Sequence, residues 1–336
     1  MNRINNRIVY LDLIRVIATL GVIALHVFAT DFYNNVGSYN WFVIVIGNCL
    51  VRWCVPLFVM ISGALFLQST KEVSYGILLK KHIPRLALAY IFWAFVYCAC
   101  NAARFIMLGR ELSFNMLVHV FHLWYIPMII GVYLLIPVLR KISGDKNLIQ
   151  SILILWILYL LGSFCKLQLI THIGVLFKGN AIFEFSGYFL LGYYLSNYTI
   201  TIRQIRWIYL IGIIGAVVCI SVNLIVPYIY GVRKSTLIGY TTPPVVAMSL
   251  ALFVLIKQLT PKIEHKVIAF IEYVRKDLFG IYLTHLMWLY ILNTPIFRDL
   301  CNHLISLPLI IIAIFVLSLY TTKVIRLIPL LKKTVE

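Results

Sequence analysis

The stretch LDLIRVIATLGVIALH, from Leu11 to His26, is an apolar helical run that carries three ionisable side chains. At ~100° per residue, Asp12, Arg15 and His26 fall on one stripe of such a helix, because steps of three and eleven residues both return close to the same face. At 1.5 Å per residue, Arg15 and His26 are ~16 Å apart along the axis, which is more than half of a hydrocarbon core of about 30 Å. The sequence therefore predicts a polar line that runs deep into a membrane.

Two interpretations of this stripe are open. Ionisable side chains inside a bilayer cost several kcal/mol and persist where they face a bundle interior or a wet cavity, so a functional site is the default hypothesis. In the alternative, Asp12 and Arg15 form an ion pair at a helix end near the interface, while His26 bonds to a neighbouring helix. The functional interpretation predicts that the three side chains share an internal cavity.

The composition is that of a helical membrane protein. Of 336 residues, 62% are hydrophobic and only 12% are charged, and the mean hydropathy is +0.96. No soluble domain tolerates these values, so we expect an all-α, polytopic fold. About ten runs are long enough to span a bilayer, approximately 8–30, 42–67, 84–108, 119–139, 149–170, 181–199, 206–228, 242–259, 278–294 and 305–325.

The connections between these runs are short. The longest is only about twenty residues, so residues 1–336 are expected to form a single membrane domain. The first run has no small-residue cleavage pattern, and a cleavable signal peptide is therefore not expected. The seven cysteines mostly lie within apolar runs without metal-ligand spacing, and we interpret them as small core residues.

The basic residues are distributed unevenly between the two sides. With the N-terminus inside, 20 of the 29 Lys and Arg residues fall in inside segments and 7 in outside segments. By the positive-inside rule, both termini are predicted to be cytoplasmic. This distribution accounts for most of the net charge of +18, so nucleic acid is not an expected partner.

The second run, NCLVRWCVPLFVMISGALF, places Arg52 within a span. A buried arginine cannot deprotonate and needs an anion, a carbonyl group or water beside it. Pro56 frees the backbone carbonyl of Arg52, one turn earlier. The alternative is a kinked packing helix from which Arg52 extends outward.

With these two spans, the chain resembles the integral-membrane acyltransferase 3 family, in particular the short O-acetyltransferases of surface polysaccharides such as enterobacterial common antigen. The matching segments follow in order: LDLIRVIATLGVIALH with ten residues between Arg15 and His26, RWCVPLFVMISGALF around Arg52, HLWYIPMIIGVYLLIPVLR from His122, and GIYLTH ending at His285. The resemblance implies a multi-pass protein of the bacterial inner membrane with about ten helices. It also implies an acyl-CoA donor on the cytoplasmic side and a hydroxyl of a surface polysaccharide or lipid-linked glycan as acceptor.

One segment departs from the family. Similar proteins often carry Arg-x-x-Arg before the third span, whereas KKHIPR places His82 and Arg85 there. Lys80, Lys81 and Arg85, together with Arg52, are expected to bind the donor. Lysine supplies charge for the CoA phosphates but does not reproduce the bidentate fork of arginine. The hydrolase-like domain that is fused to some relatives is also absent from this sequence.

The chemistry of acyl transfer agrees with this implication. Transfer from a thioester to a hydroxyl requires a base for the hydroxyl proton and donors for the developing oxyanion. We assign His26 as the base, with a covalent acyl-histidine intermediate as an open alternative. Arg15 or Arg52 supplies the positive field, and Asp12 orients Arg15 because residues three apart meet on a helix.

The acceptor is expected at the outer side. His122 and Trp124 are candidate acceptor-binding residues, although His and Trp at this level are also typical of the interfacial belt. Glu184 is either an acceptor ligand or the partner of an intramembrane cation. His285 is interpreted as structural. No metal and no bound cofactor are expected, and acetyl-CoA or another acyl-CoA acts as co-substrate.

Two other classes of protein are alternatives to an O-acyltransferase. A proton-coupled transporter or flippase for a glycan or another polar solute also has a seam of Arg, His, Asp and Glu. Such carriers are typically built from broken helices or repeats, which are not evident in this sequence. A purely structural scaffold has no need of buried charge.

Overall fold

The computed structural model describes residues 3–68, 74–107, 109, 121–165, 181–231 and 236–336, with side chains from residue 9 onward and without that of Phe121. Parts of the sequence-based expectations lie outside these residues. They are the ends of the predicted spans at 108, 119–120 and 166–170, the loop cations Lys71, Arg110, Lys166, Lys178, Arg233 and Lys234, the side chains of Arg3 and Arg7, and two histidines, His119 and His172.

Every regular element in the described part of the chain is helical. In order, the elements are α1 (Arg3–Ala29), α2 (Tyr39–Leu50), α3 (Cys54–Phe66), α4 (Tyr75–Ile77), the π-helical turn η1 (Leu78–His82), α5 (Ile83–Met107), the 3-10 turn η2 (Phe121–Trp124), α7 (Tyr125–Leu134), α8 (Ile136–Ser143), α9 (Lys146–Phe164), α11 (Ala181–Asn197), α12 (Ile202–Tyr230), α13 (Pro243–Leu259), the 3-10 turn η3 (Thr260–Lys262), α14 (His265–Val274), α15 (Leu278–Leu292), α16 (Pro295–Arg298), α17 (His303–Leu327) and α18 (Pro329–Lys332).

Seven of the predicted runs coincide with helical segments that are long and apolar enough to cross a membrane. These are Val9–Ala29, Tyr39–Phe66, Tyr75–Met107, Lys146–Phe164, Ile202–Tyr230, Pro243–Lys262 and His303–Leu327. An eighth candidate is a pair of helices bent by 54°, His122–Leu134 and Ile136–Ser143. The two remaining runs fall on α11, with 17 described residues, and on the 15-residue α15. The chain is thus an all-helical, multi-pass membrane protein.

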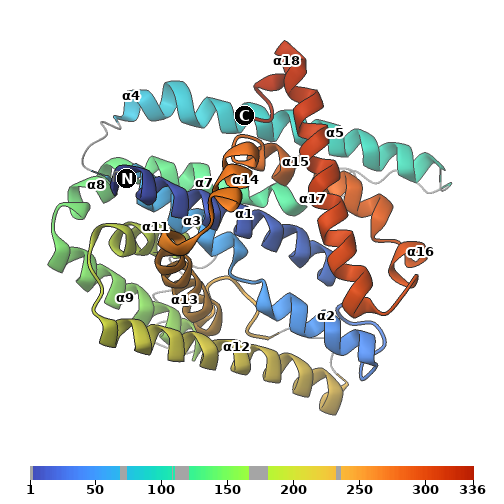
Figure 1. Ribbon diagram of the computed structural model, residues 1–336, viewed down its shortest axis with the longest axis horizontal. Helices are drawn as coiled ribbons and strands as arrows, with labels where there is room; N and C mark the ends of the chain where they lie inside the picture. Colours follow the sequence, from blue (N-terminus) through green and yellow to red (C-terminus); the bar gives the residue numbers. More distant parts are fainter. Residues whose placement is uncertain (1–2, 69–73, 108, 110–120, 166–180, 232–235) are drawn as a thin grey trace.

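Helix α1 lies inside the bundle. In Figure 1, α5 and α12 run along opposite sides of the molecule and α1 lies between them. Helix α1 contacts α2, α3, α13, α14, α15 and α17. Its residues Ile14, Ala18 and Ile23 are fully buried. Much of α1 is therefore packed against other helices of the bundle.

Helices α3 and α11 form a close contact through two glycines. A Cβ atom at Gly63 would lie 1.8 Å from the backbone oxygen of Phe189, and a Cβ atom at Gly192 would lie 2.0 Å from that of Met60. Small residues allow helix backbones to approach closely in membrane bundles, where packing replaces the hydrophobic effect as the driving force. These glycines set the position of α3, and with it one wall of the cavity described below.

We expect Gly192→Ala to destabilise the protein by ~1–3 kcal/mol or more, since the added methyl group meets backbone that cannot rotate away. The melting temperature of the detergent-solubilised protein measures this effect. Gly144→Ala is the matched control, because its Cβ would meet only the Lys141 backbone oxygen at 3.9 Å. Equal melting temperatures for the two variants would contradict the proposed contact.

The second predicted span is interrupted where Arg52 lies. Helix α2 ends at Leu50 and α3 begins at Cys54, and a turn joins them. The backbone amide of Cys54 donates to the carbonyl of Val51 over 3.1 Å. Pro56 has no amide hydrogen to continue an α-helical ladder back to the Arg52 carbonyl, and it is tolerated in the first turn of a new helix. The arginine therefore lies in a turn between two helices.

Candidate active site

A cavity of about 540 Å³ opens between α1, α3, α5, α7 and α15. Its described lining contains five basic side chains and one acidic side chain, Arg15, Arg85, Arg275, Lys276, Arg326 and Glu336, with His82 beside them. Several of these residues lie near helix ends, at the start of α5, directly before α15 and at the end of α17. One end of the cavity is therefore strongly basic.

The other lining residues come from deeper positions along the same helices. Val22 follows Arg15 by seven residues in α1, which is ~10 Å along the axis. Val55, Phe58 and Tyr125 lie with it in the lining. The cavity therefore passes from a cationic end to a region of apolar and aromatic side chains.

Asp12 holds Arg15 in place. The Arg15 guanidinium donates to Asp12 Oδ1 over 3.0 Å, and Arg275 Nη1 lies 3.8 Å from Asp12 Oδ2. Asp12 is 8% exposed and does not line the cavity. Arg15 does line it. The hydroxyl of Thr19, the fourth polar residue near this stripe, donates to the Arg15 carbonyl over 2.8 Å. The carboxylate thus lies behind the guanidinium and aims it at the cavity.

His26 pairs with His285. Its Nδ1 lies 2.9 Å from the carbonyl oxygen of Val22 and 3.1 Å from His285 Nε2. His285 Nδ1 in turn contacts the carbonyl oxygen of Tyr282 at 2.5 Å. Val22 and Tyr282 both line the cavity, and each precedes its histidine by about one helical turn. The histidine pair therefore lies about one turn beyond the cavity lining, between α1 and α15.

His122 joins this pair from a third element, η2. Its ring centroid is 5.8 Å from that of His285, and its backbone carbonyl accepts a hydrogen bond from the Tyr282 hydroxyl over 2.5 Å. Tyr97 of α5 packs against His122 with the ring centroids 4.7 Å apart. His122 is thus a buried member of a histidine cluster rather than an interfacial belt residue. The sequence alone does not place His285 in this site, although Tyr282 and His285 are spaced to share one helix face.

The four residues expected to bind the donor are separated by the fold. Arg85 lines the cavity, whereas Lys80 and Lys81 are exposed and outside its lining. Arg52 donates from Nε to Asn48 Oδ1 over 2.9 Å, and Nη2 contacts the same oxygen. Arg52 is also outside the lining of the cavity.

Three basic residues that the sequence interpretation missed take part in the cavity. Arg275 and Lys276 precede α15, and Arg326 lies near the end of α17. Arg326 forms a hydrogen-bonded ion pair with the buried Asp277 and a second contact with Glu336 at 3.3 Å. The clustered basic residues at positions 275 and 276 were a visible signal, but nothing in the local pattern related them to Arg15.

Trp124 and Glu184 meet at one loop. The indole ring of Trp124 stacks on Tyr240 with the ring centroids 5.6 Å apart and an interplanar angle of 22°. Glu184 Oε2 accepts a hydrogen bond from the hydroxyl of Thr241 over 3.2 Å. Phe185 contacts the rings of both Trp124 and Tyr240. These two candidate acceptor residues thus share the loop before α13, while His122 lies with the other histidines.

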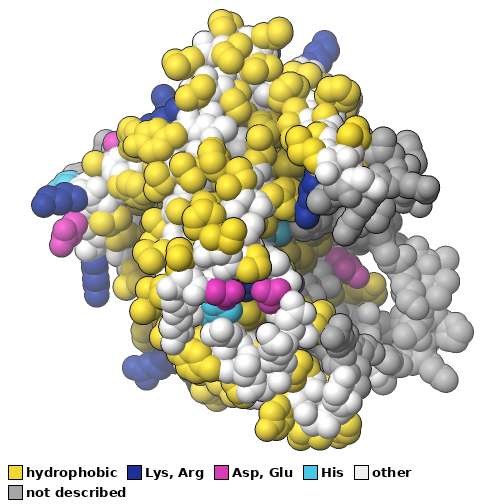
Figure 2. All heavy atoms as spheres, turned by 90° about the vertical axis from the view of Figure 1, so that its right-hand side faces the viewer, with side chains coloured by type: hydrophobic (Ala, Val, Ile, Leu, Met, Phe, Trp, Pro, Cys, Tyr) yellow, Lys and Arg dark blue, Asp and Glu magenta, His cyan; other side chains and the backbone are white. Residues whose placement is uncertain are grey.

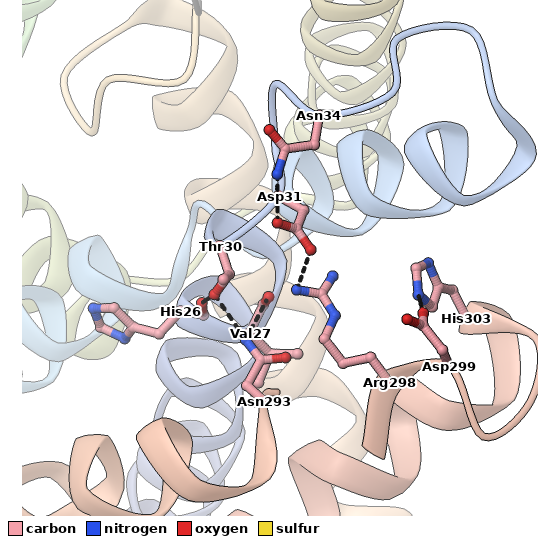
Figure 3. Close-up of polar contacts among 9 residues, drawn as sticks. All are labelled: His26, Val27, Thr30, Asp31, Asn34, Asn293, Arg298, Asp299 and His303. Carbon is pink, nitrogen blue, oxygen red and sulfur yellow. Dashed lines mark hydrogen bonds and ion pairs between the residues drawn. The ribbon is translucent and has the colours of Figure 1, made fainter. Parts of the chain in front are cut away.

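A polar network anchors the end of α1 that follows His26 (Figure 3). The amide of Asn293, after α15, donates to the Thr30 hydroxyl over 2.7 Å and to the Val27 carbonyl over 3.3 Å. Asp31 forms an ion pair with Arg298 over 2.5 Å, and that arginine side chain is only 3% exposed. The network therefore ties the end of α1 to the segment between α15 and α17, and it fixes the position of His26 relative to His285.

The molecular face at the right of Figure 1 is mostly hydrophobic or uncharged. Figure 2 shows this face, with a small group of acidic, basic and histidine side chains near its centre. Near the end of α1, Asp31 pairs with Arg298, and Asp299 lies 3.3 Å from His303.

The comparisons with known proteins identify the family. A search of curated proteins and a search of solved structures both give no match. The model of the acyltransferase 3 family, described as an acyltransferase domain, matches residues 8–325. This region contains the Asp12–Arg15 pair, the three histidines and all the basic cavity residues except Arg326. The chain belongs to the acyltransferase 3 family of membrane acyltransferases.

Proposed function

We propose that the protein is an O-acyltransferase of the bacterial inner membrane. It transfers an acyl group, acetyl by the family resemblance, from acyl-CoA to a hydroxyl of a surface polysaccharide or lipid-linked glycan. One observation carries this proposal: the basic cavity of about 540 Å³ leads towards the His26–His285 pair. Acyl-CoA has an anionic end and a reactive thioester end, which match the basic end of the cavity and the histidine pair.

The basic end of the cavity supplies the groups that phosphate recognition needs. Acyl-CoA carries phosphates at one end and a thioester at the other. Arginine binds phosphate with a planar fork, and charge-assisted hydrogen bonds are about twice as strong as neutral ones. Arg85, Arg275 and Arg326 place such forks in the lining, with Lys276 beside them. The phosphates bind at this end and the acyl group extends towards His26.

His26 acts as the general base, and Arg15 assists. The base takes the proton of the acceptor hydroxyl while that oxygen attacks the thioester carbonyl. The carbon–sulfur bond then breaks, and the departing CoA thiolate receives this proton from the His26 imidazolium. Arg15, oriented by Asp12, supplies positive charge for the oxyanion that forms at the carbonyl.

Trp124 and Glu184 are proposed to bind the acceptor. A carboxylate accepts hydrogen bonds from sugar hydroxyls, and the aromatic rings of Trp124 and Tyr240 provide a flat apolar surface. His122 connects this region to the base through its contact with His285. The acceptor hydroxyl therefore approaches His26 from the side opposite the donor.

The proposed topology has about ten membrane helices in a single domain, with both termini in the cytoplasm. It rests on the uneven distribution of Lys and Arg in the sequence. It also places the start of α5, the segment before α15 and the end of α17 on the cytoplasmic side. Acyl-CoA then enters the basic end of the cavity directly from the cytoplasm.

The test measures how much acyl-CoA is consumed and how much CoA is released by the purified protein in liposomes. We expect release of CoA only when a glycan acceptor is present, together with an acyl group on that glycan by mass spectrometry. Solute uptake into liposomes without acyl-CoA, and without CoA release, would instead support a proton-coupled carrier.

The basic cavity allows a sharper test with matched variants. We expect Arg85→Gln to raise the KM for acyl-CoA by ~10- to 100-fold, because a lost hydrogen bond to a charged group costs ~1.5–3 kcal/mol. Lys80→Gln is the control, since it removes the same charge from an exposed position outside the cavity. Steady-state kinetics measure both values, and an equal KM for the two variants would argue against phosphate binding in the cavity.

A further inference from the structure

We propose that His285 is a positioning residue for acyl transfer, which holds His26 in the tautomer whose Nε2 is the basic nitrogen. This inference rests on the proposed function and extends it to a residue that lies outside the donor and acceptor sites. It starts from the two histidine rings and the two carbonyl oxygens they contact, those of Val22 and Tyr282.

The tautomer of His285 follows from its partner. A backbone carbonyl oxygen only accepts hydrogen bonds, so the nitrogen 2.5 Å from the Tyr282 oxygen must carry the hydrogen. His285 Nδ1 is therefore the donor. A neutral imidazole has one donor and one acceptor nitrogen, and Nε2 of His285 is consequently an acceptor.

The tautomer of His26 follows in turn. Its Nδ1 lies 2.9 Å from the Val22 carbonyl oxygen and 3.1 Å from the acceptor nitrogen of His285. Both neighbours accept, so Nδ1 of His26 carries the hydrogen and shares it between them. Nε2 of neutral His26 is then unprotonated, and this is the nitrogen able to take a proton from a hydroxyl.

The pair also suits the charged intermediate. When His26 takes the acceptor proton at Nε2, its ring becomes an imidazolium, and the hydrogen bond from Nδ1 to His285 becomes charge-assisted and stronger. The proton at Nε2 then passes to the CoA thiolate, and the original tautomer returns without rearrangement of His285. The aspartate of a Ser-His-Asp triad supports its histidine in the same manner, by orientation and by stabilising the cation.

The surroundings of His285 keep its ring in this position. His285 is fully buried in α15, and the Tyr282 ring lies over it with the centroids 6.0 Å apart. The hydroxyl of Tyr282 is held in turn by the His122 carbonyl. The Asn293 amide anchors α1 and α15 together about two turns away. His285 is therefore presented to His26 by a rigid helix contact.

The test compares His285→Gln with His285→Asn. The asparagine amide reaches only the Nδ1 position, so it keeps the bond to Tyr282 and loses the acceptor for His26. The glutamine amide reaches the Nε2 position, and its oxygen accepts from His26 Nδ1. We expect kcat to fall by ~10-fold or more in His285→Asn with an unchanged KM for acyl-CoA, and to stay within about threefold of wild type in His285→Gln.

A purely structural role of His285 predicts a different order of activity for these two variants. If His285 only anchors α15 through Tyr282, the asparagine variant is at least as active as the glutamine variant, and that result would overturn the proposal. A second measurement needs no His285 variant: ¹⁵N-histidine spectra of the wild-type protein, with the His26 signals assigned by their loss in His26→Ala. Protonation at Nδ1 of His26 is expected, and protonation at Nε2 of the neutral ring would also overturn it.

Failure of this inference is distinguishable from failure of the proposed function. Full activity of His26→Ala would show that His26 is not the base, and the mechanism proposed for this pair would then be wrong. If His26→Ala is inactive while His285→Asn is fully active, only the proposed role of His285 is wrong.

Discussion

His26→Ala is expected to lower kcat for acyl transfer by ~10²- to 10⁴-fold, the usual contribution of a general base. The histidine lies beyond the apolar end of the cavity, opposite the basic end, with Arg15 about three helical turns away in α1. Its removal therefore leaves the phosphate-binding side chains in place. Acyl-CoA should bind with nearly unchanged affinity, as measured by isothermal titration calorimetry, while CoA release with acceptor present falls.

His265→Ala is the matched control for this prediction. His265 is the first residue of α14 and is exposed, so its replacement removes an imidazole that does not line the cavity. We expect its kcat to equal that of the wild type. Normal acylation of the surface glycan by His26→Ala, in a strain without a second acyltransferase, would rule out the proposed mechanism.

Arg15→Gln is expected to lower kcat/KM by ~10²- to 10³-fold, the typical cost of losing a donor to a developing oxyanion. Arg15 is the cavity residue that Asp12 orients, with 3.0 Å between their paired atoms. Arg15→Lys keeps the charge but loses the planar fork, so its activity should lie between those of the wild type and Arg15→Gln. Steady-state kinetics with varied acyl-CoA separate an effect on kcat from one on KM.

Two further variants sharpen this result. Asp12→Asn removes the orienting charge while Arg15 stays in the cavity, so it should lower kcat with little change in KM. Arg203→Gln removes the same charge as Arg15→Gln from an exposed position in α12 and should behave like the wild type. Wild-type kinetics for Arg15→Gln would exclude a role for this guanidinium in the reaction.

The local parts of the site were predictable from the sequence. Asp12 and Arg15 are three residues apart in an unbroken helix, so their pairing is decided within one turn. The lengths of the apolar runs also predicted where helices form, and seven of those runs coincide with candidate membrane spans.

The long-range parts of the site were not predictable in this way. His26 and His285 are 259 residues apart in the chain, and the sequence pattern predicts only a structural role for His285. Lys80 and Lys81 carry the same charge as Arg85, yet of these three only Arg85 lines the cavity. A cluster of charges in sequence shows which side of the membrane it faces, but not which of its members turns towards a cavity.

The sequence by itself determined the helices, their apolar character and the polar stripe of α1, because hydrophobic spacing, proline and charge act over a few residues. Only the tertiary structure decided which side chains meet across helices. That outcome depends on the rotation and offset of each helix, which are set by contacts such as Gly192 against the Met60 backbone. A rotation of one residue, ~100°, would turn His285 away from His26, and no local pattern in either helix encodes that angle.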